Sequence, residues 1–339
     1  MTNAQNLGKD GGSALRAGRL AFDGGAMLAP MSGVSDLGMR RAAERFGATL
    51  VFSEMVASDT FLAGGEESQL RAEGDGVALH AVQLVGREPG PMAETARRVV
   101  GDGARIVDIN MGCPARRVAG GLAGCALMRD LDHAARIIDS VASAVSTPVT
   151  VKMRLGWDDD ERNAPQLARR AEAAGAAMIT VHGRTRRQFY DGRADWSAVG
   201  EVAAAVSVPV VVNGDCQGLE DARAMLAASG ARAVMIGRAA VGAPWIVGAV
   251  ARSLATGAPF TLPPLAERRV AALDHFASLL AAMGARSGLR HARKHLAAYA
   301  EKAGAPAALR AELVRTDDPD VAMALLARAF EPAEGREAA

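Results

Sequence analysis

Short apolar runs rich in β-branched residues alternate along the chain with longer alanine-rich stretches. The runs have the composition of strands buried on both faces. The stretches between them, such as 131–138 and 164–174, repeat apolar positions every three or four residues, which is typical of amphipathic helices. The eight predicted strands cover Ala26–Met31, Thr49–Met55, His80–Gly86, Ile106–Met111, Val149–Leu155, Met178–His182, Val208–Asn213 and Ala233–Gly237.

Eight strand-then-helix units predict an α/β fold, a (β/α)8 TIM barrel. The alternative, a doubly wound sheet, usually carries a Gly-x-Gly-x-x-Gly turn after its first strand, whereas here that strand ends in Ala29-Pro30-Met31. After the barrel comes a proline-rich linker, and the remaining chain has a helical pattern with no strand signal. The predicted parts are a disordered N-terminal extension (1–18), the barrel (19–255), a C-terminal helical domain (265–330) and a frayed tail (331–339).

Composition and charge narrow the class of protein. Of 339 residues, 50% are hydrophobic and 23% charged, which excludes a disordered or collagen-like chain. Three cysteines argue against a disulfide scaffold and predict a reduced, cytoplasmic setting. The longest uncharged apolar run, Ala239–Ala251, is too short for a bilayer, so we expect no membrane partner, and we expect a monomer. The 39 basic and 38 acidic residues give no general attraction to nucleic acid.

Polar side chains collect at the carboxyl ends of the predicted strands, where TIM barrels carry their active sites. Ordinary turn chemistry does not explain this set of amide, amine, guanidinium, imidazole and thiol groups. The sequence therefore predicts one polar site at the barrel mouth. In chain order the strand ends carry Pro30-Met31, Ser53-Glu54-Met55, Gln83, Asn110-Met111-Gly112-Cys113-Pro114, Lys152-Met153-Arg154, His182-Gly183-Arg184, Asn213-Gly214-Asp215 and Gly237-Arg238.

Several of these residues indicate particular chemistry. Glycines and Arg238 at the last two strand ends are suited to a phosphate. Lys152 fits either a Schiff base, as in aldolases, or a cation beside a flavin, and the amide-rich neighbouring strand ends favour the flavin. The Cys113 thiol, with an ordinary pKa of about 8.5, is mostly protonated at neutral pH and can deliver a proton. Cys125 and Cys216 have no comparable setting and are predicted to be buried.

The spacing of cysteines and histidines shows no Cys-x-x-Cys pair and no His-rich segment. These are the usual sequence signs of a metal site. We therefore predict no metal.

The strand-end segments resemble those of the tRNA-dihydrouridine synthases, in particular the bacterial B-type, over about residues 20–300. Six of them occur in order at matching strand ends, which makes the resemblance specific. The family often has a tryptophan before Tyr299, where this chain has Ala298. The segments are Ala29–Met31, Asn110–Pro114, Val151–Arg154, Val181–Arg186, Val212–Asp215 and Met235–Ala240, with Ala292–His295 in the helical domain.

The resemblance implies an FMN-binding barrel with a helical tRNA-binding domain. It implies reduction of the C5–C6 double bond of a D-loop uridine in tRNA, driven by NADPH or NADH. A hydride from the flavin would reach C6, Cys113 would protonate C5, and Asn110 and Arg154 would hold the uracil. The implied cofactor contacts are Pro30, Met31, Ser32, Gln83, Lys152, His182, Asn213, Gly214, Asp215, Gly237 and Arg238. The implied tRNA contacts are Arg184, Arg186, Arg290, Arg293, Lys294 and His295.

Two other functions remain open from the sequence. An FMN barrel could reduce a free pyrimidine or an enone, although the helical domain with Arg293-Lys294-His295 argues against it. A non-enzymatic RNA-binding protein would not need Cys113, Lys152 and Gly237-Arg238. Because aromatic residues are only 4% of the chain, we expect base recognition to rest on the flavin and the polar strand ends.

Overall fold

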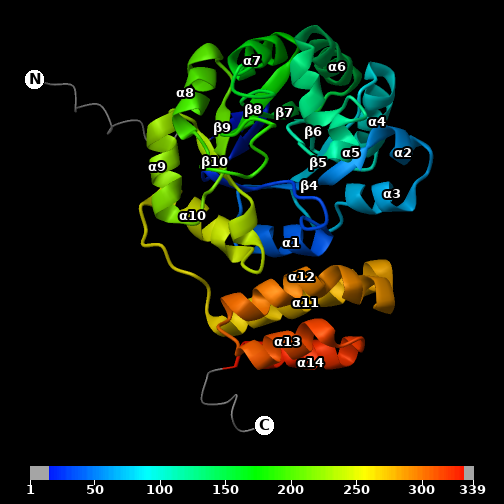
Figure 1. Cartoon of the computed structure of the whole chain (residues 1–339), viewed down its shortest axis with the longest axis vertical. Coiled ribbons are helices and arrows are strands. Elements are labelled where there is room, and N and C mark those ends of the chain that lie inside the picture. Colours follow the sequence, from blue (N-terminus) through cyan, green and yellow to red (C-terminus); the bar gives the residue numbers. More distant parts are fainter. Residues whose placement is uncertain (1–14, 332–339) are drawn as a thin grey trace, which may run out of the picture.

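The protein, described by a computed structural model over residues 15–331, is built around a closed barrel of eight parallel strands (Figure 1). Each strand pairs with the next along the chain, and β10 pairs with β3 to close the circle. Every strand overlaps one of the predicted runs, so the predicted (β/α)8 TIM barrel is confirmed. The strands are β3 (Ala26–Leu28), β4 (Leu50–Ala57), β5 (His80–Val85), β6 (Ile106–Met111), β7 (Val149–Arg154), β8 (Ala176–His182), β9 (Val210–Asn213) and β10 (Ala233–Ile236).

Helices cover the outside of the barrel (Figure 1). Three of them begin at aspartates whose side chains accept a hydrogen bond from the first turn: Asp36, Asp130 and Asp195. Within residues 15–331 no helix is both long and apolar enough to cross a membrane. The helices are α1 (Leu37–Arg45), α2 (Ser58–Leu62), α3 (Glu66–Ala72), α4 (Pro89–Gly101), α5 (Arg116–Ala119), α6 (Leu131–Ala144), α7 (Ala164–Ala173), α8 (Trp196–Ala205), α9 (Leu219–Ser229) and α10 (Trp245–Thr256), with short 3₁₀ helices at Gly124–Arg129 and Arg238–Ala240.

A small hairpin precedes the barrel and closes its amino end. Strands β1 (Leu15–Ala17) and β2 (Leu20–Phe22) pair antiparallel, and Leu15 and Phe22 are buried against residues near the starts of the barrel strands. The predicted disordered extension over 1–18 is therefore corrected at its end, because residues 15–18 belong to this hairpin. Residues 1–14 lie outside the described part of the chain. The hairpin leaves the carboxyl end of the barrel as the open end.

Four helices form the C-terminal domain predicted from the sequence. They are α11 (Leu265–Met283), α12 (Ala285–Lys302), α13 (Ala307–Arg315) and α14 (Pro319–Ala329). Their shared core includes Phe276, Tyr299 and Leu326, and it continues into the barrel through Trp245 of α10. Helix α11 packs on α1, so the domain lies against one side of the barrel (Figure 1). The predicted tail from 331 onward lies outside the described residues except for its first residue.

Candidate functional site

A cavity of about 460 Å³ opens at the carboxyl end of the barrel. This volume is in the range of small-molecule and cofactor sites. Every residue that the sequence analysis assigned to the cofactor, the uracil or the proton donor lines it. These residues are Pro30, Met31, Ser32, Gln83, Asn110, Cys113, Lys152, Arg154, His182, Asn213, Gly214, Asp215, Gly237 and Arg238.

A buried aspartate that the sequence analysis missed lies beneath this pocket. Asp108 of β6 is 1% exposed and accepts hydrogen bonds from Thr150 Oγ1 at 2.5 Å and from Gln83 Nε2 at 2.6 Å. Burial raises its pKa to about 6. The sequence did contain a sign of this buried group: Asp108 is an acidic residue within the apolar run Ile106–Ile109. An ionisable side chain in a buried strand is rarely found without partners. Asp108 fixes the orientation of the Gln83 side-chain amide, so that Gln83 Oε1 is free to accept a hydrogen bond from the next residue of this hydrogen-bond network.

That next residue is Asn110, which holds the cysteine loop in place. Asn110 Nδ2 donates to Gln83 Oε1 at 2.8 Å. Its Oδ1 accepts from the backbone N–H of Gly112 at 3.1 Å and of Cys113 at 2.9 Å. The orientation of the Asn110 amide is therefore fully determined, and it sets the position of Cys113 relative to the strand ends.

The Cys113 thiol lies in the pocket and is held in its neutral form. Burial raises its pKa above the ordinary value, against the lowering effect of the Ala115 N–H and of the charges of Arg154 and Lys152. A neutral thiol at physiological pH is a proton donor, and the two nearby cations stabilise the thiolate that proton transfer leaves. Cys125 and Cys216 are buried, as predicted.

Arg154 connects two loops at the mouth of the pocket. Its Nε donates to the Gly112 carbonyl at 2.9 Å, and one terminal nitrogen donates to the carbonyls of Thr185 and Phe189 at 2.9 and 2.8 Å. The side chain is 2% exposed overall yet lines the pocket. Arg154 thus anchors the Cys113 loop to the loop after β8.

Lys152 and His182 form the cationic and donor side of the pocket. Lys152 Nζ donates to Asn213 Oδ1 at 3.1 Å, and burial, together with the charge of Arg154, lowers its pKa to about 8. Burial and the charge of Lys152 hold the pKa of His182 well below its usual value, so this ring is neutral. Arg184 can only donate, and it lies 3.2 Å from His182 Nε2, which leaves the proton on Nδ1.

Two arginines and Asp215 form a charged cluster at the ends of β9 and β10. Asp215 accepts from both terminal nitrogens of Arg184, at 3.0 and 2.6 Å, and from Arg238 at 2.8 Å. Burial acts to raise the pKa of Asp215, but the bonds from Arg184 and the Ala194 N–H keep it below its usual value. A carboxylate repels a phosphate, so Asp215 itself is not suited to bind one. Its ion pair holds the Arg238 side chain, which lines the pocket and is 58% exposed, in an accessible position.

Gly214, beside Asp215, meets a steric requirement. Its φ is +122°, and a Cβ there would lie 2.7 Å from the Ala194 side chain and 3.0 Å from His182. Only glycine fits without displacing the imidazole.

The predicted tRNA contact Arg184 is corrected by its burial. It is 1% exposed, and besides Asp215 it bonds the carbonyls of Asp191 and Gly192. A side chain so placed cannot reach a phosphate of an RNA bound outside. Arg184 follows a glycine at a strand end, and this position is compatible with a side chain that points into the protein or out to solvent. The sequence could not distinguish these two orientations.

Replacing Arg184 with methionine is expected to destabilise the fold by about 3 kcal/mol, because it leaves part of the Asp215 charge and two carbonyls without their partner. Urea unfolding of the purified variant measures this change. The control is Arg187→Met, at a side chain that is 72% exposed, for which we expect a change below about 0.5 kcal/mol. Equal stabilities of the two variants would contradict the structural role of Arg184.

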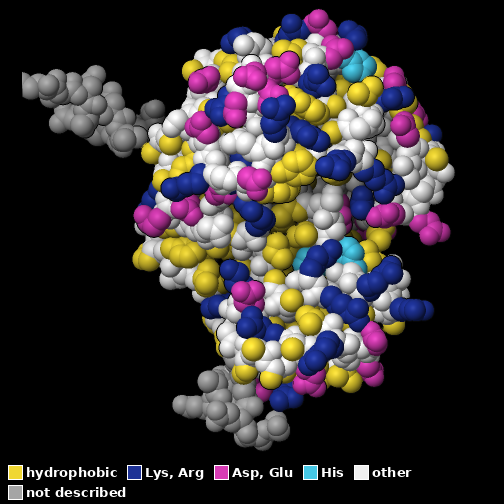
Figure 2. Space-filling view, in the orientation of Figure 1, with side chains coloured by type: hydrophobic (Ala, Val, Ile, Leu, Met, Phe, Trp, Pro, Cys, Tyr) yellow, Lys and Arg dark blue, Asp and Glu magenta, His cyan; other side chains and the backbone are white. Residues whose placement is uncertain are grey.

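His295, also predicted to contact tRNA, is 1% exposed and faces the barrel. It is corrected for the same reason as Arg184. The half-exposed Arg293 is paired with Asp317 at 2.5 Å within the helical domain. Arg290 and Lys294 are exposed and Arg186 is partly exposed. Lys and Arg side chains lie on both sides of the hollow between the barrel and the helical domain (Figure 2).

Two aromatic residues at the pocket mouth were missed. Phe189 and Tyr190 line the pocket, and Tyr190 is 53% exposed. The guanidinium groups of Arg154 and Arg238 lie 5.6 and 5.3 Å from the Tyr190 ring centre. The expectation that base recognition rests on the flavin and the polar strand ends did not take into account this aromatic face beside the pocket.

The titration of Asp108 gives a pH-dependent prediction. Its pKa of about 6 is above the ordinary aspartate value, so the fold favours its protonated form. Its contribution to stability is full below about pH 4 and is lost as pH rises through about 6. We expect the free energy of unfolding of the wild type, relative to Asp108→Asn, to fall by about 3 kcal/mol between about pH 4 and pH 7. Parallel pH profiles of the two proteins, measured by urea unfolding, would contradict the burial of this carboxyl.

Comparison with known proteins identifies the family. The model of the dihydrouridine synthase (Dus) family matches residues 27–334. A probable tRNA-dihydrouridine synthase of Rhodobacter capsulatus is 51% identical over 317 residues, which are 93% of this chain and 97% of that protein. The tRNA-dihydrouridine synthase B of Xanthomonas axonopodis pv. citri is 46% identical over 306 residues, 90% of this chain and 92% of the relative.

Among solved structures, a variant of NCR from Zymomonas mobilis is similar with a TM-score of 0.52, at 18% identity over 76% of this chain and 94% of the other. At this identity the similarity concerns the fold alone. The family match and the curated relatives each extend over nine-tenths or more of the chain, and the family match includes the whole pocket. The chain belongs to the dihydrouridine synthase family.

Proposed function

We propose that the protein reduces a D-loop uridine of tRNA to dihydrouridine, with FMN in the barrel pocket and NADPH or NADH as the reductant. The observation that carries this proposal is the neutral Cys113 thiol, fixed by Asn110 in the same pocket as the Lys152 cation. The relatives named as tRNA-dihydrouridine synthases support the substrate. A tRNA substrate in turn favours a cytoplasmic enzyme.

The donors in the pocket fit FMN. Lys152 offers a cation to the electron-rich pyrimidine edge of a flavin, and His182 Nδ1 offers an N–H. At the ends of β9 and β10, Gly214, Gly237 and the accessible Arg238 fit a phosphate. Pro30, Met31 and Ser32 form a wall of the same pocket. When bound there, FMN supplies the hydride that the reduction requires.

The remaining proton comes from the protein. The C5–C6 double bond of uracil gains a hydride at C6 and a proton at C5, and Cys113 Sγ donates that proton. The positive charges of Arg154 and Lys152 stabilise the resulting thiolate, which regains a proton from solvent before the next turnover. We propose that Asn110 and Arg154, which line the pocket next to Cys113, also form its uracil-facing side.

A uridine inside tRNA must leave its stack to enter this pocket. The Tyr190 ring at the entrance offers a face on which a displaced base can stack. Exposed arginines on α5 (Arg116 and Arg117) and α12 (Arg286 and Arg290) supply positive charge for the phosphates. With Arg184 and His295 buried, the contacts that remain from the sequence-based set are Arg186, Arg290, Arg293 and Lys294.

The cofactor and substrate are tested together with the purified full-length protein. We expect a yellow protein whose flavin absorbance is bleached by NADPH without oxygen and returns when tRNA lacking dihydrouridine is added. Protein that is colourless after purification, and that binds no added FMN, would contradict the cofactor. Equal reoxidation by free uridine would favour the reduction of a free pyrimidine instead.

A further inference from the structure

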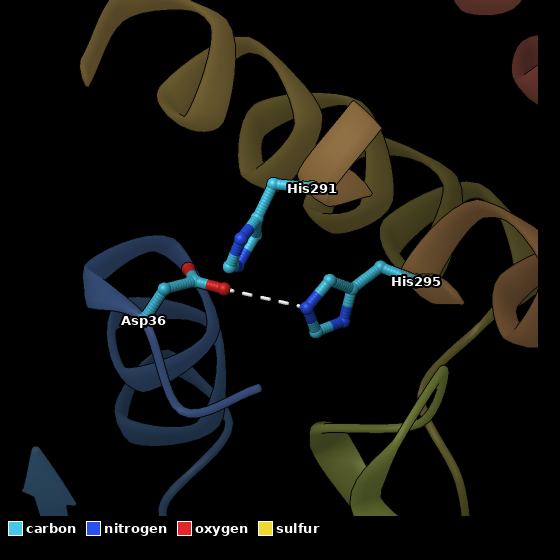
Figure 3. A group of neighbouring side chains, drawn as sticks. All are labelled: Asp36, His291 and His295. Atoms are coloured by element: carbon cyan, nitrogen blue, oxygen red, sulfur yellow. Dashed lines mark ion pairs between the residues drawn. The ribbon is translucent and has the colours of Figure 1, made fainter. Parts of the chain in front are cut away.

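Three ionisable side chains meet where the helical domain contacts the barrel. His291 and His295 lie one turn apart on α12, and both face Asp36 at the start of α1 (Figure 3). One ligand atom from each of these three residues lies within 4.8 Å of the other two. Asp36 is far in sequence from the two histidines, and none of the three residues lines the catalytic pocket.

The imidazole of His295 is buried and that of His291 is partly buried, and both rings have nitrogens without a hydrogen-bond partner. Among the described residues, no hydrogen bond is made by His291 Nε2 or by either ring nitrogen of His295. His295 is 1% exposed, and its Nε2 lies 3.4 Å from Asp36 Oδ2. A buried ring nitrogen without a hydrogen-bond partner destabilises the fold. A metal ion beside the Asp36 carboxylate would provide the partner that His291 Nε2 and His295 Nε2 lack.

The Asp36 carboxylate has other hydrogen bonds, and these leave the side that faces His291 and His295 available for a ligand. Asp36 Oδ1 accepts from the Met39 N–H and, at 3.0 Å, from His275 Nε2, whose other nitrogen is paired with the Tyr299 hydroxyl. Oδ2, also 3.1 Å from His275 Nε2, is the oxygen nearest His295. The His275 bond holds the carboxylate in a fixed orientation, as partners of metal-binding groups commonly do.

We propose that Asp36, His291 and His295 bind a divalent transition-metal cation, with Zn²⁺ as the best match. Two imidazoles and a carboxylate are typical ligands of Zn²⁺, which binds them at about 2.0–2.2 Å. The three side chains need to close by about 1 Å to reach those distances. A cavity of about 70 Å³, lined by Asp36 and His291, adjoins the site and has room for water as the fourth ligand.

Charged groups of both signs surround the site. Glu54 lines the same small cavity and adds a second carboxylate. The cations that face this region are Arg40, Arg71 and Lys294. Arg71 is paired with Glu67 at 2.6 Å and Arg40 bonds the Glu73 carbonyl, so their positions do not depend on Asp36. A bound ion would join α12 to α1 and so tie the helical domain to the barrel.

The proposed site differs from the expectation of no metal, and the reason lies in how the ligands are distributed along the sequence. The pair His291-x-x-x-His295 has the spacing that places two ligands on one helix face, but it is only half of a site. The third ligand, Asp36, lies far away in the sequence, and only the packing of α11 on α1 and of α12 on α11 brings it close.

The test is a Zn²⁺ titration of the tag-free, full-length protein after chelator treatment, followed with a competing zinc indicator. We expect one Zn²⁺ per wild-type chain and at least ~100-fold weaker binding by His291→Leu. His133→Ala changes a partly exposed histidine of α6 and is the matched control, expected to bind as the wild type does. Asp36→Asn tests the carboxylate, although it also removes part of a helix cap.

Thermal unfolding with and without Zn²⁺ is a second test, because a substitution could weaken binding by disturbing the fold and not by removing a ligand. Without metal, His291→Leu is expected to be as stable as the wild type or more stable, since it removes an unpartnered buried nitrogen. With Zn²⁺ at ~100-fold above the Kd, the Tm of the wild type should rise by several degrees and that of the variant should not. No stoichiometric binding by the wild type, or equal binding and equal Tm shifts in both proteins, would overturn the site.

Discussion

Cys113→Ala is expected to lose dihydrouridine formation by about 10²–10⁴-fold while FMN remains bound. The alanine removes the proton donor for uracil C5 but leaves Lys152, His182 and Arg238 in the pocket. Asn110 still fixes the loop, because its bonds go to backbone N–H groups and not to the thiol. The measurement is dihydrouridine content in tRNA by mass spectrometry, alongside the flavin spectrum of each protein.

A second cysteine provides the control for this prediction. Cys216 also lines the pocket, but its thiol lies near the Gly218 carbonyl, and Cys216→Ala should retain activity. Cys113→Ser should be nearly as inactive as the alanine variant, since an alcohol is a much weaker acid than a thiol. Full activity of Cys113→Ala would show that another group donates the proton.

Lys152→Met is expected to slow flavin reduction by NADPH by about 10²–10³-fold. The unbranched side chain is one atom shorter and loses the cation that would stabilise the negative charge arriving on the flavin. Rapid-mixing absorbance without oxygen measures the rate. Lys302→Met, at an exposed position at the end of α12, is the matched control and should reduce at the wild-type rate.

The same lysine predicts a pH profile. Burial, with the charge of Arg154, lowers the pKa of Lys152 to about 8, so the cation is present below that pH and lost above it. The rate of flavin reduction in the wild type should therefore decline as pH rises through about 8. In Lys152→Met this decline should be absent. A decline of equal size in both proteins would assign it to another group.

The barrel and most of its pocket were predictable because both depend on local patterns. Continuous apolar runs indicate parallel strands buried on both faces, and the ends of such strands converge in any TIM barrel. Gln83, Lys152 and Asn213 were therefore expected to meet before their contacts were known, and the structure places all three around one cavity.

What the sequence could not provide was the direction and partner of each side chain. Arg184 follows a strand end exactly as Arg238 does, but Asp215 and two carbonyls draw it into the protein. Tyr190 reaches the pocket only because its loop folds back over the mouth, held by the Arg154 bond to Phe189. Such pairings join segments far apart in sequence, where no local periodicity reports them.

The most direct test of the account is the product itself. Purified protein is incubated with NADPH and a tRNA transcript that lacks dihydrouridine, and the position and amount of dihydrouridine are determined by mass spectrometry. The account predicts dihydrouridine in the D-loop in the wild type, none above background in Cys113→Ala, and little conversion of free uridine. Absence of dihydrouridine with flavin-loaded wild-type protein, or equal conversion of free uridine and tRNA, would contradict it.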